Sequence, residues 1–222
     1  VTVEPLAGET NPGNNTLVRV LNVEGNKPRL LYIEGDPRWE YKFIQRALEE
    51  DRSLEMVGMV RTTQNKIYRQ GIADAKELEQ GFPGTGEELF AYQGLIIGNV
   101  EAAYFTAKQL DLIRAFSDRR GGGVLFLGGK DALTEGGYHR SSLADMLPVV
   151  LPATKGTFRR DRISAALTAA GRDSLIPRLE EDPAKNAERW KQMPELAGWR
   201  WLGELKPGAS ELLRTRNGPL LV

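Results

Sequence analysis

The chain has 222 residues, 41% of them hydrophobic, which is long and apolar enough for one α/β domain with an appendage. Its 30 basic and 30 acidic residues cancel, so composition argues against a nucleic-acid partner and against attraction to anionic lipid. The absence of cysteine excludes disulfides, thiolate metal sites and cysteine nucleophiles. The sequence also contains no apolar run of membrane-helix length and no N-terminal signal-peptide pattern.

The first segment, residues 1–23, alternates apolar and polar residues on either side of a turn-forming stretch at residues 8–15. This pattern predicts a β-hairpin. Two strands cannot bury a face of their own, and the turn sequence resembles that of bacterial immunoglobulin-like modules. We therefore interpret residues 1–27 as the terminal strands and linker of such a module. Residues 218–222 form a strand-like apolar run, and we expect both ends to be cuts in a longer protein.

An apolar strand at residues 30–34 runs directly into the turn Gly35-Asp36-Pro37 and then into a helical pattern. Proline is favoured in the first turn of a helix, and Asp36 is placed to cap the free N–H groups. Trp39 and Phe43 recur at helical spacing. The sequence therefore predicts a βα unit with a site at the C-terminal edge of its strand.

Strand and helix patterns alternate from residue 28 onward. Apolar runs predict strands at residues 30–34, 55–60, 94–97 and 124–127. Helices are predicted at residues 39–51 and 103–119, with shorter helices near 87–90, 141–147 and 182–190 and late strands at 202–205 and 211–215. This alternation favours a mostly parallel sheet covered on both faces. We therefore predict a flavodoxin-like three-layer α/β sandwich, preceded by the N-terminal β-hairpin remnant.

The ends of the predicted strands carry the residues best placed to bind a ligand, because parallel α/β sheets bind ligands there. Asp36 as a helix cap and Trp39 as a packing residue remain alternative interpretations. The glycine pair after the fourth strand favours either an anion-binding nest or a tight turn. The candidate ligand-binding residues are Asp36, Arg38, Trp39, Glu40, Asn99, Gly128, Gly129, Lys130 and Asp131.

Asp131, Glu135 and His139 follow one another at four-residue spacing. On a helix this spacing would align two carboxylates and an imidazole as metal ligands or as an acid–base set. The intervening Gly136-Gly137 pair disfavours that helix, and a solvated loop with an ordinary histidine is the alternative. We predict no bound metal and no cofactor. The competing hypothesis is a hydrolase, with or without a metal, that uses Asp36, Glu40, Asp131, Glu135 and His139.

Several short motifs together resemble one known family. They are residues 31–43, Gly121-Gly122-Gly123 with Gly128-Gly129, Gly136-Gly137-Tyr138, residues 143–148, Leu167-Thr168 with Gly171-Arg172, Asn186 with Trp190, and residues 205–209. Over residues 28–222 the chain resembles the class I glutamine amidotransferase-like domain of large bacterial membrane-anchored proteins, truncated at its C-terminus. The resemblance implies the fold, an extracytoplasmic place in the bacterial cell envelope, and membrane association through segments outside this sequence.

The reaction for which that family is best known requires a cysteine at a strand-to-helix elbow, together with a histidine and a glutamate. This chain has no cysteine, and glycine occupies the elbow-like position after Leu127. We therefore predict no catalytic residues and no glutaminase activity. The predicted function is a non-catalytic binding or assembly domain whose partner is an unidentified protein or small molecule. Besides the hydrolase, a carbohydrate-binding module stays open, and it would require Trp39 or Tyr138 exposed beside polar side chains.

Overall fold

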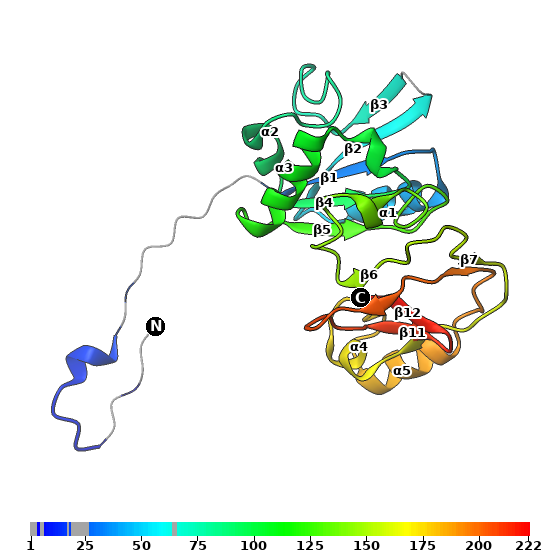
Figure 1. Ribbon diagram of the computed structural model, residues 1–222. Helices are drawn as coiled ribbons and strands as arrows, with labels where there is room; N and C mark the ends of the chain where they lie inside the picture. The colour runs from blue at the N-terminus through cyan, green and yellow to red at the C-terminus, as the bar shows by residue number, and fades with distance from the viewer. Residues whose placement is uncertain (1–3, 5–6, 17, 19–26, 64–65) are drawn as a thin grey trace.

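The computed structural model describes residues 4, 7–16, 18, 27–63 and 66–222. Its centre is a five-stranded sheet in the order β3-β2-β1-β4-β5 (Figure 1). The strands are β1 (Arg29–Glu34), β2 (Glu55–Thr63), β3 (Lys66–Gln70), β4 (Gly94–Ile97) and β5 (Gly123–Phe126). β1, β2, β4 and β5 are parallel, whereas β3 is antiparallel to β2. The carboxyl ends of the four parallel strands therefore meet at one edge of the sheet.

Helices cover both faces of this sheet because its strands place apolar side chains on both sides. The helices are α1 (Trp39–Glu50), α2 (Gly86–Phe90) and α3 (Ala107–Asp118). Leu31 and Ile33 of β1 pack in the same core as Ile113 of α3. Tyr32 points to the opposite face and packs with Tyr41 of α1. Burying each large apolar side chain contributes about 1.5–3 kcal/mol to folding, so the two cores hold the sheet between its helices.

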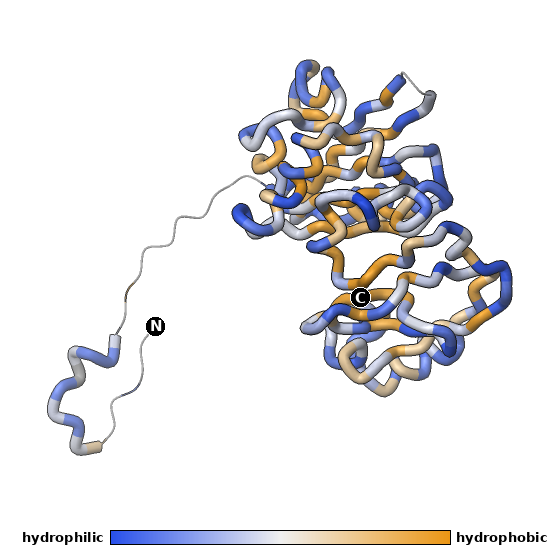
Figure 2. Tube along the Cα trace, viewed as in Figure 1, coloured by the Kyte–Doolittle hydropathy of each residue, from blue (hydrophilic) through white to orange (hydrophobic). Residues whose placement is uncertain are grey.

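Short strands in small antiparallel sheets follow the central sheet and lie below it in Figure 1. β6 (Val149–Val150) pairs with β10 (Glu204–Leu205), and β7 (Phe158–Arg159) pairs with β9 (Trp199–Arg200). β8 (Ala166–Leu167), β11 (Leu213–Thr215) and β12 (Gly218–Leu221) form a third sheet, and β8 contacts α4 (Ala169–Asp173) and α5 (Pro183–Lys191). Figure 2 shows hydrophobic segments in the central sheet and again in the strands just below it.

The predicted flavodoxin-like three-layer sandwich is wrong. The central sheet is mixed, and after β5 the chain builds small antiparallel sheets instead of further helices and strands on that sheet. The prediction missed β3, because its sequence Lys-Ile-Tyr-Arg-Gln mixes charged and apolar residues without a buried run. The late strands predicted at residues 202–205 and 211–215 are confirmed by β10 and β11, and the strand-like run at residues 218–222 by β12. The prediction missed the two-residue strands β7, β8 and β9, which are too short to carry a periodic signal.

The individual strand predictions at residues 30–34, 55–60, 94–97 and 124–127 are confirmed by β1, β2, β4 and β5, and α1, α2, α3 and α5 confirm four predicted helices. The helix predicted at residues 141–147 is wrong, since that stretch forms turns. The two strands of the β-hairpin predicted for residues 1–23 fall largely outside the described residues. Within its predicted turn, Pro12–Asn15 forms a 3-10 helix, η1. Two further 3-10 helices are η2 (Ala102–Tyr104) and η3 (Tyr138–Arg140).

Candidate ligand-binding site

Glu34, the last residue of β1, is a fully buried carboxylate at the C-terminal edge of the sheet. Its Oε1 accepts the N–H of Gly35 at 3.0 Å and the N–H of Asn99 at 2.8 Å. Its Oε2 accepts the Tyr32 hydroxyl at 3.0 Å and Nη2 of Arg38 at 2.8 Å. A buried charge is tolerated only when it is paired and hydrogen-bonded in this way. Glu34 therefore fastens the ends of β1 and β4 to each other and fixes Arg38.

Arg38 connects the end of β1 to the end of β5. Besides Glu34, its guanidinium donates to the carbonyl oxygen of Gly128 at 2.9 Å and lies 3.5 Å from a Glu40 carboxylate oxygen. Burial alone would lower the pKa of Arg38, but the hydrogen bond and charge of Glu34 raise it above its ordinary value. The same carboxylate, together with burial as the larger cause, raises the pKa of the Tyr32 hydroxyl. Arg38 therefore stays positively charged at the border of the pocket described below.

Asn99, after β4, is almost fully buried and holds two aspartates. Its Nδ2 donates to Asp36 at 2.9 Å, and its Oδ1 accepts the N–H of Asp131 at 2.6 Å. Nζ of Lys130 lies 3.0 Å from the Asp36 carboxylate. Burial would raise the pKa of Asp36, but Lys130 and Asn99 outweigh burial and lower it. The predicted capping role of Asp36 is wrong, because the N-cap of α1 is Arg38 and it makes no side-chain cap bond.

Three glycines permit this close packing of strand ends. A side chain at Gly35 would overlap the carbonyl oxygen of Asn99, and one at Gly98 would overlap the Glu34 carboxylate. A side chain at Gly129 would overlap the Asn99 side chain. The glycine pair after β5 therefore includes one position, Gly129, that requires glycine for space, whereas the surroundings of Gly128 are open.

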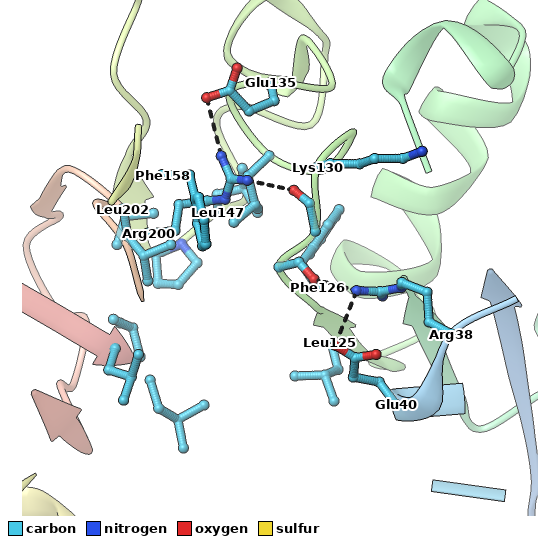
Figure 3. Close-up of a pocket in the computed structure, with 18 of the residues that line it drawn as sticks. Arg38, Glu40, Leu125, Phe126, Lys130, Glu135, Leu147, Phe158, Arg200 and Leu202 are labelled. Carbon is cyan, nitrogen blue, oxygen red and sulfur yellow. Dashed lines mark hydrogen bonds and ion pairs between the residues drawn. The ribbon is translucent and has the colours of Figure 1, made fainter. Parts of the chain in front are cut away.

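A pocket of about 760 Å³ lies beside this network, between β5 and the C-terminal strands. Figure 3 shows Arg38 and Glu40 on one side of the pocket and Arg200 on the other, with Leu125 and Phe126 of β5 between them. The apolar walls are formed by Val124, Leu125, Phe126, Leu133, Leu147, Pro148, Val149, Phe158, Leu202, Leu220, Leu221 and Val222. A mostly apolar pocket with a few charged groups is typical of a ligand site.

The far wall of the pocket is fixed by an ion pair that sequence reasoning missed. Arg200 lies 3.1 Å from a Glu135 carboxylate oxygen and donates to the carbonyl oxygen of Gly129 at 2.7 Å. Glu135 also accepts the N–H of Gly156 and the N–H of Thr157, both at 2.9 Å. Burial would raise the pKa of Glu135, but Thr157, Gly156 and Arg200 lower it. The partners are 21 to 65 residues away in sequence, so no local pattern indicates the pair.

Arg160 is an exposed cation of the pocket lining, as is Lys130, which is paired with Asp36. In the part of the chain that the structure describes, Arg160 has no hydrogen-bond or ion-pair partner. Sequence reasoning also missed this residue, although it stands in the basic stretch Arg159-Arg160-Asp161-Arg162. Arg160 therefore places a positive charge without a partner among the described residues next to the apolar walls of the pocket.

The structure brings most of the predicted site residues together. Arg38, Glu40, Gly128, Gly129 and Lys130 line the pocket, and Asp36, Asn99 and Asp131 form the adjoining network. The exception is the indole of Trp39, which lies outside the pocket lining and is 69% exposed. It stacks on Phe43 with ring centroids 6.2 Å apart, and Nζ of Lys42 lies 5.3 Å from its ring centroid.

The residues of the competing hydrolase hypothesis do not gather around one point. Glu135 is bonded to Arg200, Glu40 borders Arg38, and both ring nitrogens of His139 are buried without a hydrogen-bond partner among the described residues. Gly137 adopts a left-handed conformation with φ 82°, so four-residue spacing does not produce one helical face here. Among the described residues, no group of three histidine, aspartate or glutamate side chains is arranged to hold a metal ion.

None of the described helices has the length and apolar content needed to cross a membrane. Comparison with known proteins finds no matching family model, no matching curated protein and no matching solved structure. The resemblance to amidotransferase-like domains therefore stays a prediction, and the functional conclusion rests on the geometry of the pocket.

Proposed function

We propose that this protein is a non-catalytic binding domain and that its ligand, which combines apolar groups with an anionic group, occupies the pocket beside β5. The observation that carries the proposal is the pocket itself, about 760 Å³ with apolar walls and a few fixed charges at the carboxyl ends of parallel strands. From the sequence resemblance we further propose that the domain belongs to a bacterial envelope protein.

The state of the carboxylates supports binding over catalysis. A general acid or base works best with a pKa near the operating pH, whereas Asp36 and Glu135 have lowered pKa values because Lys130 and Thr157 stabilise their charged forms against burial. Glu34 already accepts four hydrogen bonds of 3.0 Å or less. The hydrogen bonds of these three carboxylates position the residues around the pocket.

An apolar anion, 8-anilinonaphthalene-1-sulfonate, tests the proposal by fluorescence titration. Wild-type protein should bind it saturably at one site, with unchanged near-ultraviolet circular dichroism. Leu125→Glu places a negative charge in the pocket wall and should weaken binding about tenfold or more, which corresponds to about 1.4 kcal/mol. The matched control is Tyr68→Glu, because Tyr68 is 53% exposed on β3 and Leu125 is 42% exposed on β5. Absence of saturable binding, or equal affinity in both variants, would contradict the proposal.

Carbohydrate binding at Trp39 is a second candidate function. The exposed, stacked pair Trp39 and Phe43, with Lys42 over the indole, offers a flat aromatic surface beside a polar group. Tyr138, by contrast, is fully buried and cannot serve. Affinity electrophoresis in gels containing soluble β-glucan or chitosan tests this candidate. Retardation that Trp39→Ala abolishes would support it, and unchanged mobility in every gel would remove it.

A further inference from the structure

We infer that the ligand of this pocket is an extended peptide segment that pairs with the free edge of β5 and places an acidic group at Arg160. This inference rests on the proposed function, because it names the ligand of the same pocket. It is carried by three observations: an unpaired strand edge, an apolar pocket that runs along that edge, and an uncommitted cation at the pocket.

The edge of β5 has backbone groups available for pairing. Among the described residues, β5 has β4 as its one neighbour in the sheet. The N–H of Leu127 donates to the carbonyl oxygen of Ile97 at 2.8 Å, which continues the ladder toward β4. Since N–H directions alternate along a strand, the N–H groups of Val124 and Phe126 point away from β4. Unpaired edge groups of this kind accept an added strand.

The side chains of β5 lack the features that normally prevent pairing at a sheet edge. The segment Gly123-Val124-Leu125-Phe126-Leu127 carries no charge and no proline, although Leu125 is 42% exposed. Soluble proteins normally protect sheet edges with charges, proline or bulges. An uncharged, partly exposed edge strand is therefore a candidate interaction surface.

The pocket runs along this edge. Val124, Leu125 and Phe126 form one wall, and Leu220 and Leu221 of β12 form another. The side chains of an extended peptide alternate in direction, so a strand added to β5 would direct every second side chain toward the apolar walls. A peptide with apolar residues at alternate positions fits this arrangement.

Charge complementarity defines the rest of the peptide. Lys130 is 3.0 Å from Asp36, and Arg200 is 3.1 Å from Glu135, so both cations have partners. Arg160 is exposed and has no such partner among the described residues. An aspartate, a glutamate or a terminal carboxylate on the peptide supplies the missing negative charge.

Backbone amide hydrogen exchange, measured by NMR with the peptide acetyl-Asp-Val-Thr-Val-Thr-Val-amide, tests this inference on the full chain. With saturating peptide, exchange at Val124 and Phe126 should slow about tenfold or more, since hydrogen-bonded amides exchange only after local opening. The amides of Lys66–Gln70 in β3 serve as the internal reference and should not change. The same peptide with N-methylated valines should bind more weakly, because it loses edge hydrogen bonds.

A charge swap tests the role of Arg160. Arg160→Glu should weaken binding of the aspartate peptide about fivefold or more, within the range expected of an exposed charge pair. The same variant should regain affinity for a peptide with lysine in place of aspartate, which a general loss of folding would not allow.

The outcomes separate this inference from the proposed function. If the aromatic sulfonate binds in the pocket and the peptide leaves exchange at Val124 and Phe126 unchanged, the pocket takes small ligands and the peptide inference is overturned. If exchange at β5 slows with protein concentration alone and sedimentation shows a dimer, a second copy is the occupant and the inference is also overturned. If neither probe binds, the proposed function fails as well.

Discussion

The two edges of the central sheet differ in how they are protected. β3 carries Lys66 and Arg69, and its ladder with β2 contains a register shift between Arg61 and Thr63. Arg69 also donates to the carbonyl oxygens of Ala75 and Glu77, at 2.9 and 2.7 Å, so the following loop is tied to that edge. β5 has no charge and no bulge in its pairing with β4. One edge thus has the features that prevent strand pairing, and the other lacks them.

The difference between the two edges indicates that the β5 edge, and not the β3 edge, is the ligand-binding surface. The ends of the parallel strands are fixed by Glu34, Arg38 and Asn99, while the C-terminal strands stand opposite β5 and leave a pocket between. Rigid positioning of an open apolar surface is the arrangement expected of a binding site. Substitutions that release the end of β5 should therefore destabilise the protein, and substitutions at the β5 edge should weaken binding.

The largest effect is expected from removing the carboxylate that positions the β5 end. Glu34→Ala removes the buried carboxylate that pairs with Arg38, leaving the guanidinium with Gly128 and the exposed Glu40, and should lower the free energy of unfolding by about 3–5 kcal/mol. The control Glu55→Ala breaks the ion pair between Arg29 and the Glu55 carboxylate, which are 4.0 Å apart. The Glu55 side chain is 53% exposed, so its loss should lower the free energy of unfolding by less than about 1 kcal/mol. Urea unfolding at pH 7 measures both. Equal costs would show that Glu34 does not anchor the site.

The glycine pair after β5 gives a matched comparison of neighbouring positions. Gly129→Ala forces a methyl group into the buried Asn99 side chain, and should destabilise the protein by about 1–3 kcal/mol. Gly128→Ala enters open space and should change stability by less than about 0.5 kcal/mol. Thermal unfolding of the two variants compares them directly. A larger loss at Gly128 would contradict the packing described around Asn99.

The wall opposite β5 should respond to acid. The folded pKa of Glu135 is depressed below the ordinary value of 4.5, because Thr157, Gly156 and Arg200 outweigh burial. Its stabilising contribution is therefore complete above about pH 4.5 and is lost as pH falls through the lower folded pKa. The unfolding free energy of Glu135→Gln, followed from pH 6 to pH 3, should decline less than that of the wild type. An equal decline of the unfolding free energy in the two proteins would show that the Glu135 carboxylate does not contribute to stability.

The smallest effect on stability is expected from giving β5 the charge that β3 already has. Leu125→Lys should change the unfolding free energy by less than about 0.5 kcal/mol, since edge strands tolerate lysine. Binding of the uncharged dye Nile red in the pocket should nevertheless weaken. Tyr68→Lys on β3 is the control, and both properties should stay at wild-type level. A loss of binding in the control but not in Leu125→Lys would reverse the roles assigned to the two edges.

Sequence reasoning succeeded where burial imposes a pattern. β1 and β4 are apolar because both of their faces are covered, and α3 shows helical periodicity. The grouping of Asp36, Asn99 and Lys130 followed from the rule that parallel strands end at one edge. Trp39 has the exposure that a binding role requires, but its indole lies outside the pocket lining, because spacing along α1 does not say which stripe of the helix faces the pocket.

The rest of the site depends on contacts between distant segments. Glu34 stands at the end of an apolar run, and a carboxylate there was a signal for a buried, paired charge that we did not use. Glu135 meets Arg200 across 65 residues of sequence, and the pocket is closed by strands of two to four residues. Such short elements have no periodicity of their own, so only the folded chain shows that they face β5.

Methyl NMR of protein labelled at leucine, isoleucine and valine tests the central claim most directly, because it locates the ligand site without any substitution. On titration with 8-anilinonaphthalene-1-sulfonate, the methyl signals of Leu125, Leu147 and Leu221 should shift together with one dissociation constant, since these residues line the pocket. The methyl signals of Ile67 on β3 should stay in place. Shifts confined to residues outside the pocket, or no saturable shift at Leu125, would contradict the assignment of the binding site to the β5 edge.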